Sequence, residues 1–322
     1  MYADLRPIDV HRAAARIRGI ATRTPLRRSP GLSERAGGDV FLKLETEQVT
    51  GSFKLRGALN TLALLGEEGR RRGVVASSAG NHGLGVAYAA RHFGAPATLF
   101  VPRTAPQVKK DGIAALGARV DDSAPDYDAA MVLAKRHAEE HGVPFINPCL
   151  GDPLLAGQGT VALEIVEELP GVAALVVCVG GGGLLGGVGC FLRYVAPAVP
   201  IHGAQSDQTA AMSRSLAAGR LVEIPSAPTL ADGLAGQIDE EALEIGRHAL
   251  DGIVTLTEEE IGQAIAWLAL HEGITVEGAG AVAAAAVLFG RIPELPTPAA
   301  VVVSGRNIDR ARWEELRSRY AQ

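Results

Sequence analysis

The stretch ALVVCVGGGGLLGG, residues 174–187, decides the fold class of this chain. It opens with a continuous apolar run, which is typical of a strand buried on both faces of a parallel sheet. The run leads into four consecutive glycines, Gly180, Gly181, Gly182 and Gly183. An apolar helix is predicted to begin near Leu184. Because glycine has no Cβ, the backbone N–H groups of this turn can converge on an anion beside the positive helix end, which predicts a phosphate site in an α/β fold.

The rest of the chain repeats this alternation of short apolar runs and helical periods. In addition to the run at 174–179, strands are predicted at 39–45, 73–77, 97–101, 201–205 and 300–304. Helices are predicted over residues 82–93, 106–117, 125–141, 156–168, 184–194, 257–272 and 277–289. Continuous apolar strands joined by helices predict mostly parallel sheets flanked by helices.

Composition limits the classes of function that fit the sequence. The 322 residues include 31 Lys and Arg against 36 Asp and Glu, and only 4% are aromatic, which argues against a nucleic-acid-binding surface. The longest apolar run, residues 281–289, is far shorter than the roughly 20 residues that span a membrane, so no membrane association is expected. Three cysteines without a CxxC pair favour reduced thiols and a cytoplasmic location. The expected partner is a small molecule.

A second strand-to-helix turn lies in SSAGNHGLG, residues 77–85. Ser78, Asn81 and the loop amides precede a predicted helix, an arrangement that suits a small carboxylate or phosphate. Capping of the helix by serine and asparagine is the alternative interpretation. Two such turns indicate one ligand with two anionic groups, or two ligands that meet.

The third segment is TGSFKLRGALN, residues 50–60, where Lys54 opens a predicted helix. Only five of the 31 basic residues are lysines, so this chain uses arginine for most of its surface positive charge. A lysine amine beside Phe53 at a helix start is suited to Schiff-base chemistry with a carbonyl compound. An alternative is a nicotinamide-dependent oxidoreductase, because a GxGxxG pattern begins at Gly181 and Asp207 follows the next predicted strand.

Together the three segments resemble the fold-type II pyridoxal-phosphate enzymes, and most closely the serine/threonine dehydratase and serine racemase group. The resemblance extends over nearly the whole chain, in RTPL at 23–26, FLKLE at 41–45, QVTGSFKLRGALN at 48–60, SSAGNHG at 77–83, VPRTAPQVKK at 101–110, AGQGT at 156–160, VGGGGLLGG at 179–187, TLADGLA at 229–235, VEGAGA at 276–281 and VSGRNID at 303–309. It implies a two-domain, tryptophan synthase β-like α/β fold. The large domain would comprise residues 1–70 and 152–322, and the small inserted domain residues 71–151.

The resemblance also implies how pyridoxal 5′-phosphate would be bound. Lys54 would hold it through a Schiff base and later act as a base, while Phe53 would cover one face of the ring. Asn81 would bind the ring hydroxyl and Ser304 the pyridine nitrogen. Glu277 would lie near the ring. The phosphate would be held by Gly180, Gly181, Gly182, Gly183 and Leu184.

The implied reaction is β-elimination from L-threonine or L-serine, which gives a 2-oxo acid and ammonia. The substrate carboxylate would be bound by Ser78, Ala79, Asn81 and His82 with the loop amides. Ala79 stands where the racemases of this group have a serine, so dehydration is favoured over racemisation. Gln205 and Ala211 stand where the racemases have acidic metal ligands, so no metal site is predicted. The resemblance further implies a homodimer.

Several alternatives stay open at this point. The substrate could be another β-hydroxy amino acid, such as 3-hydroxyaspartate, phenylserine or a hydroxyectoine-pathway compound, and Arg306 in the SGRN turn is a candidate to bind a second carboxylate. Serine racemase and a non-catalytic amino-acid binder are further alternatives. The HxxEH pattern at residues 137–141 matches a zinc motif, but a solvated helix end is the favoured interpretation.

Overall fold

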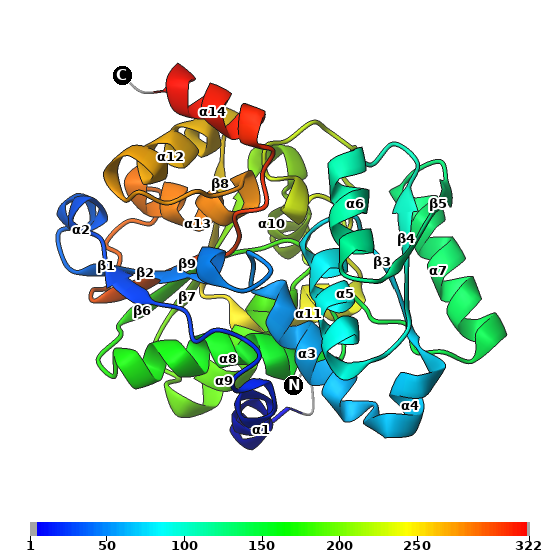
Figure 1. Ribbon diagram of the computed structural model, residues 1–322. Helices are drawn as coiled ribbons and strands as arrows, with labels where there is room; N and C mark the ends of the chain where they lie inside the picture. Colours follow the sequence, from blue (N-terminus) through cyan, green and yellow to red (C-terminus); the bar gives the residue numbers. More distant parts are fainter. Residues whose placement is uncertain (1–4, 321–322) are drawn as a thin grey trace.

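Figure 1 shows the computed structural model, which describes residues 5–320. Its strands are β1 (Leu26–Arg28), β2 (Val40–Leu44), β3 (Val74–Ser77), β4 (Ala97–Pro102), β5 (Arg119–Ala124), β6 (Ala174–Cys178), β7 (Ile201–Ser206), β8 (Gly252–Leu256) and β9 (Ala299–Val303). A six-stranded sheet has the order β1-β2-β9-β6-β7-β8, and a three-stranded sheet has the order β3-β4-β5. Only the β1–β2 pair is antiparallel among the described strands. The predicted α/β class with mostly parallel sheets is confirmed.

Helices flank both sheets (Figure 1). They are α1 (Pro7–Ile17), α2 (Pro30–Ala36), α3 (Lys54–Leu64), α4 (Gly66–Arg72), α5 (Asn81–Phe93), α6 (Gln107–Ala115), α7 (Tyr127–His141), α8 (Asp152–Glu168), α9 (Gly183–Val195), α10 (Ala211–Ala218), α11 (Glu240–Ala249), α12 (Glu258–His271), α13 (Gly278–Leu288) and α14 (Arg310–Arg319). Three short 3₁₀ helices are η1 (Glu45–Glu47), η2 (Asp207–Thr209) and η3 (Asp232–Leu234).

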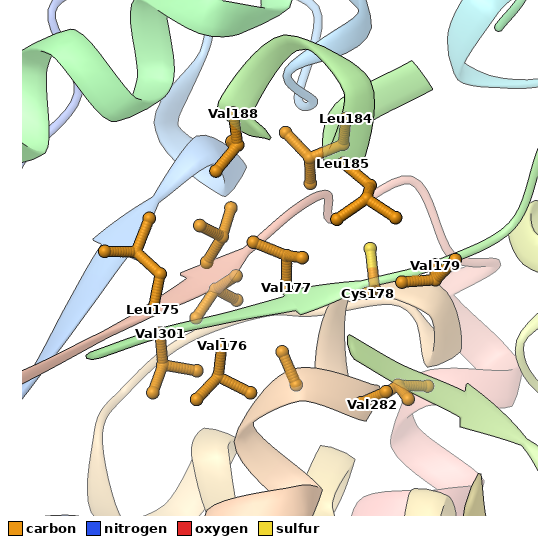
Figure 2. Packing of buried hydrophobic residues seen from close by; sticks show 14 of the residues in the cluster. Leu175, Val176, Val177, Cys178, Val179, Leu184, Leu185, Val188, Val282 and Val301 are labelled. Atoms are coloured by element: carbon orange, nitrogen blue, oxygen red, sulfur yellow. The ribbon is translucent and has the colours of Figure 1, made fainter. Parts of the chain in front are cut away.

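The centre of the six-stranded sheet is buried on both faces. Every residue of β6 and β9 is buried, as their continuous apolar sequences predicted. Figure 2 shows β6 between two helices, with Leu185 and Val188 of α9 on one face and Val282 of α13 on the other. This packing fixes the carboxyl ends of β6 and β9 side by side, where the glycine turn and Ser304 follow.

The three-stranded sheet also separates two apolar layers. Along β3, Val74 and Ala76 belong to a cluster with α3 and α5, whereas Val75 belongs to a cluster with α7. Side chains that alternate between two buried faces are expected for a strand covered by helices on both sides. The turn after β3, which contains Ser78 and leads into α5, lies at the carboxyl end of this second sheet.

The six predicted strands and seven predicted helices all exist, with ends that differ by at most four residues. Three strands were not predicted: β1, β5 and β8. Each lies at an edge of a sheet, where one side of the strand has no neighbour to bury it. The β5 sequence RVDDSA has only one buried residue and contains two aspartates, so it lacks the continuous apolar run on which the prediction depended.

The sheets draw on different parts of the chain. The three-stranded sheet is built from residues 74–124, within the predicted insertion of residues 71–151, and the six-stranded sheet from segments on either side of it. The domain boundaries themselves stay a prediction. Among the described residues, no helix combines the length and the apolar character needed to cross a membrane.

Candidate active site

A cavity of about 930 Å³ is lined by residues from both sheets. Segments that follow the carboxyl ends of β3, β6 and β9 contribute to its wall, as is usual for ligand sites in open α/β sheets. With the exception of the candidate Arg306, the sequence-predicted site residues line this one cavity: Phe53, Lys54, Ser78, Ala79, Asn81, His82, Gly180, Gly181, Gly182, Gly183, Leu184, Glu277 and Ser304. The fold therefore brings together residues that are up to 251 positions apart, from Phe53 to Ser304.

Lys54 is the first residue of α3, and the start of this helix is tied to the end of β9. The N–H of Phe53 donates to the carbonyl of Ser304 at 3.2 Å, and Ser52 bridges to Gly305. The Lys54 amine reaches into the cavity, where Nζ donates to the backbone carbonyl of Pro148 at 2.7 Å. It also lies 4.0 Å from the sulfur of Cys149. The amine is thus placed against neutral groups and open to a ligand in the cavity.

The glycine turn needs the absence of side chains that its sequence predicted. A Cβ on Gly181 would lie 2.7 Å from the sulfur of Cys149, and a Cβ on Gly183 would lie 3.0 Å from that residue's backbone. Gly182 has a φ of 88°, which favours glycine. Helix α9 begins at Gly183, so the N–H groups of its first turn have no acceptor within the helix. The turn is therefore a cradle of backbone donors at a positive helix end.

Asn81 and Glu277 meet across the cavity. Nδ2 of Asn81, the first residue of α5, donates to Oε1 of Glu277 at 2.6 Å. Burial raises the pKa of Glu277 to about 7, although the hydrogen bond from Asn81 acts in the opposite direction. Asn307 donates to Oδ1 of Asn81 at 2.6 Å and to the carbonyl of Thr50 at 2.8 Å. The amide of Asn81 is thus held from both ends.

Ser304 presents a neutral hydroxyl at the end of β9. The thiol of Cys178, at the end of the neighbouring strand β6, donates to Ser304 Oγ at 3.3 Å. Burial raises the pKa of Cys178 to about 11, so the thiol stays protonated. Ser304 in turn donates to the carbonyl of Ala279 at 3.4 Å. The pair Cys178 and Ser304 therefore brings no charge to this wall of the cavity.

The turn after β3 offers donors for a carboxylate, but not from the His82 ring. The ring is buried, and Nε2 lies 2.9 Å from the carbonyl of Ile146. Burial and the nearby charge of Lys54 lower the pKa of His82 to about 3, so the ring is neutral. Since a carbonyl only accepts, Nε2 carries the hydrogen and Nδ1 has no N–H to offer. The backbone N–H of His82, in the first turn of α5, is left for a carboxylate.

Two other candidate ligand-binding residues, Arg306 and Asp207, lie outside the cavity wall. Arg306 is exposed and is not among the residues that line the cavity, which argues against the proposed contact with a second carboxylate. Asp207 also lies outside the cavity wall, so the glycine turn lacks the acidic partner that a dinucleotide would need.

The rings of His137 and His141 stack on each other at 4.0 Å, and within residues 5–320 no group of His, Cys, Asp or Glu is placed to hold a metal ion. Gln205 donates to the carbonyl of Val179 at 3.0 Å and accepts from the N–H of Ser213 at 2.9 Å.

Three parts of the site were missed by the sequence analysis. Asn307 stands one position after Arg306 in the SGRN turn, and the motif itself was the available signal. Cys149 lies in a loop that carries no recognisable motif, although its sulfur faces both Lys54 and the glycine turn. At the cavity wall, Lys109 pairs with Asp232 at 3.4 Å, a contact between residues 123 positions apart that no local pattern could indicate.

The described residues fit a phosphorylated carbonyl cofactor. The glycine turn packs closely against Cys149 and Leu234 because it has no Cβ atoms, its backbone N–H groups lie at the start of α9, and the Lys54 amine lines the same cavity. A neutral hydroxyl at Ser304 and an amide at Asn81 supply the polar contacts that a heteroaromatic ring with a hydroxyl group requires. The donor set is that of a pyridoxal-phosphate site, without any residue that contradicts it.

Comparisons with known proteins agree with this geometry. The model of the pyridoxal-phosphate dependent enzyme family matches residues 17–305. An L-threonine ammonia-lyase of Thermotoga maritima is 43% identical over 94% of this chain and 75% of its own length. A catabolic L-threonine dehydratase of Staphylococcus aureus is 38% identical over 94% of this chain and 89% of its own. Among solved structures, maize serine racemase has a TM-score of 0.92 at 30% identity, with 99% of each chain covered. This chain therefore belongs to the pyridoxal-phosphate-dependent enzyme family and uses pyridoxal phosphate as its cofactor.

Proposed function

We propose that the protein is an ammonia-lyase that dehydrates L-threonine or L-serine to a 2-oxo acid and ammonia. The observation that carries the proposal is the position of the Lys54 amine, 2.7 Å from the Pro148 carbonyl in a cavity whose other wall is the glycine turn. Relatives named L-threonine ammonia-lyase and L-threonine dehydratase, 38% to 43% identical over most of the chain, support it.

Each predicted residue has a place in this scheme. Lys54 would carry the cofactor covalently, with Phe53 beside the ring. The amides of Gly180–Gly183 and Leu184 would hold the phosphate. Ser304 would meet the pyridine nitrogen and Asn81 the ring hydroxyl, with Glu277 behind Asn81. The Ser78 hydroxyl and the backbone N–H groups of Ala79, Asn81 and His82 would bind the substrate carboxylate.

When bound, pyridoxal phosphate supplies an electron sink conjugated with the α-carbon of an amino acid. The protein would supply the proton transfer, with the Lys54 amine as the base that takes the α-proton, since this amine reaches into the cavity. The Pro148 carbonyl then accepts a hydrogen bond from that amine and holds it in the cavity. Lys54 would return that proton to the β-hydroxyl, which would leave as water. The resulting enamine would tautomerise to an imine, which water would hydrolyse to the 2-oxo acid and ammonia.

Two features favour elimination over racemisation. The side chain of Ala79, which lines the cavity, is a methyl group and carries no proton for the opposite face of the α-carbon. The Ser304 hydroxyl and the Cys178 thiol are neutral, so no carboxylate stabilises a protonated pyridine nitrogen. A pyridine nitrogen left neutral by these residues would withdraw electrons less strongly, which would favour prompt loss of the β-hydroxyl over return of a proton to the α-carbon.

The organisation of the protein is part of the same proposal. Residues 1–70 and 152–322 would form the large domain and residues 71–151 the small one, with the cavity between them. The small domain would close on the substrate carboxylate, since the 77–83 turn belongs to it. We place the enzyme in the cytoplasm, where its three free cysteines stay reduced, and expect a homodimer, which light scattering of the purified protein would detect.

The test combines cofactor mapping with a substrate screen. Borohydride reduction of the purified protein, followed by peptide mass analysis, should place the cofactor on Lys54. Ammonia release is then measured with L-threonine, L-serine, 3-hydroxyaspartate and phenylserine, while chiral chromatography follows D-serine. The variant Lys135→Ala is the matched control, because it removes another lysine of the cavity wall and should keep full turnover. Formation of D-serine faster than ammonia, or a cofactor on a lysine other than Lys54, would overturn the proposal.

A further inference from the structure

Asn81 has an amide that could be placed in two orientations, with its oxygen and nitrogen exchanged. Only the hydrogen-bond partners decide which orientation the protein adopts. Because Asn81 lines the cavity, this choice determines whether a ligand there meets an N–H group or a carbonyl oxygen.

The first partner of Asn81 is Asn307, whose own orientation is set by the backbone. Nδ2 of Asn307 lies 2.8 Å from the carbonyl of Thr50, and a carbonyl can only accept a hydrogen bond. Asn307 must therefore turn its NH₂ group toward Thr50. The same NH₂ group lies 2.6 Å from Oδ1 of Asn81, so Asn81 is required to present its oxygen on that side.

The second partner, Glu277, requires the same orientation. Its Oε1 accepts from Nδ2 of Asn81 at 2.6 Å, and Glu277 is only 6% exposed, with the backbone N–H of Asn307 as a further donor to its carboxyl group. Gly305 leaves room for this contact, because a Cβ there would overlap Glu277 Oε1 and lie 3.1 Å from Nδ2 of Asn81. The two hydrogen bonds thus run in one direction: Asn307 donates to Asn81, and Asn81 donates to Glu277.

We propose that Asn307 is a positioning residue that fixes the orientation of the Asn81 amide, so that Asn81 offers an N–H group to the cofactor. Nδ2 of Asn81 has two hydrogens, and Glu277 takes one of them. The second is available to the oxygen on the pyridine ring, which rests on the cofactor placement in the proposed function. Reversal of the amide would turn a carbonyl oxygen toward that ring oxygen and change both cofactor affinity and the visible absorption band.

The variant Asn307→Asp tests this directly. A carboxylate accepts only, so Asp at this position needs the NH₂ group of Asn81 and forces the amide to reverse. At pH 8, where Glu277 is ionised and can only accept, the reversed Asn81 then turns Oδ1 toward it, acceptor against acceptor. We expect about a 10-fold weaker affinity for pyridoxal phosphate and, at equal occupancy, a shifted visible band. The matched control is Arg306→Ala, an exposed neighbour outside the cavity wall, which should change neither quantity.

A second substitution separates positioning from general damage. In Asn307→Asp with Glu277→Gln, the new Gln donates an N–H to the reversed oxygen of Asn81, so the clash is relieved while the reversal remains. The double variant should recover about half or more of the loss in Tm, yet keep the shifted visible band. Glu277→Gln alone keeps an acceptor for Asn81 and gives the reference band and the reference Tm against which the double variant is compared. In an Asn81→Ala background the recovery in Tm should disappear.

The two readouts distinguish the two proposals. Additive Tm losses at positions 307 and 277, or an unshifted band in Asn307→Asp, would overturn the positioning role. Should Asn307→Asp not fold, Asn307→Ala combined with Glu277→Gln takes its place, because neither position then imposes an orientation on the Asn81 amide, and a band identical to that of Glu277→Gln alone would overturn the proposal equally. The Tm measurements need neither cofactor nor turnover, so they test the hydrogen bonds from Asn307 through Asn81 to Glu277 even in a protein without pyridoxal phosphate. A protein that bound no pyridoxal phosphate would count against the proposed function alone.

Discussion

Lys54 and Arg56 are cations two residues apart on α3, yet the protein treats them in opposite ways. Arg56 is fully buried, with hydrogen bonds to both carboxylate oxygens of Glu45 at 2.8 Å and to those of Glu164 at 2.6 and 2.9 Å. Burial alone would lower the pKa of Arg56, but these two carboxylates raise it above its usual value. Lys54 has the Pro148 carbonyl and an open cavity.

The charge of Arg56 therefore stabilises the fold, whereas the amine of Lys54 is accessible to a ligand. The Arg56 cluster also includes Lys43, which is fully buried and lies 2.7 Å from Glu164, so charges from β2, η1, α3 and α8 neutralise one another. A buried charge is tolerated only when it is paired in this way. The cluster anchors one side of the first turns of α3, which leaves the other side free to present Lys54 to the cavity.

The largest expected effect is on turnover. Lys54→Met should lower kcat for ammonia release from L-threonine by about 10⁴-fold, because it removes the group that, in the proposed function, carries the cofactor and moves the α-proton. The free energy of unfolding, measured without cofactor, should fall by less than about 1 kcal/mol, since the side chain has a single strong hydrogen bond. Turnover within 10-fold of the unmodified enzyme would contradict the catalytic role.

Arg56→Met, the same substitution two residues further along α3, should instead have its main effect on stability. Arg56→Met leaves Glu45 and Glu164 buried without their main partner, which should lower the free energy of unfolding by about 3–5 kcal/mol. Urea unfolding followed by circular dichroism measures this loss. Arg56→Lys, which keeps the charge but not the forked geometry, should lose less. A loss below about 1 kcal/mol for Arg56→Met would show that the cluster does not hold the helix.

Glu277 should add a pH dependence that the Arg56 cluster lacks. Burial raises its pKa to about 7 in the folded protein, against an ordinary value of 4.5. The folded state therefore binds more protons than the unfolded state between these values, and stability is lost as the pH rises through this window. Relative to Glu277→Gln, the unmodified protein without cofactor should lose roughly 3 kcal/mol between pH 4.5 and 8.

Urea unfolding of both proteins at several pH values gives this difference, because titrations elsewhere in the chain cancel in the comparison. The sign is decisive. A difference that stays constant with pH, or that grows in favour of the unmodified protein as the pH rises, would be incompatible with a carboxyl group that is buried and largely protonated below pH 7.

The smallest expected effect is on cofactor affinity at the glycine turn. Gly181→Ala should weaken pyridoxal phosphate binding by about 10-fold, since its Cβ would lie 2.7 Å from the sulfur of Cys149 and must displace it. Adding Cys149→Ala should recover most of the loss. Gly183→Ala, whose Cβ would press on the backbone of Cys149 at 3.0 Å, should not be rescued. Equal behaviour of the two double variants would show that Cys149 does not limit the turn.

Much of this site could be read from the sequence because its parts are local. The glycine turn, the 77–83 turn and the start of α3 are each a strand end or helix end with its own pattern, and all of them line the cavity. The contacts between these parts could not be read. The path from Asn307 through Asn81 to Glu277, the sulfur of Cys149 against Gly181, and the pair of Lys109 with Asp232 join segments with no sequence relation.

His82 and Arg306 show that a sequence motif can also suggest a contact that the structure does not make. Both stand in matching motifs, yet the ring of His82 is used by the Ile146 carbonyl and Arg306 is exposed. A motif specifies which residue types occur, but not where each side chain points.

By itself the sequence determined the α/β class, the buried strands and the glycine turn, because apolar runs and glycine turns act through local backbone physics. Residues such as Glu277 and Ser304 were predicted only through the resemblance to a known family. Only the tertiary structure decided which charge is neutralised and which is left to react. Arg56 and Lys54 are both cations near the start of one helix, and their different roles come from Glu45, Glu164 and the Pro148 carbonyl, which the fold brings to them from other parts of the chain.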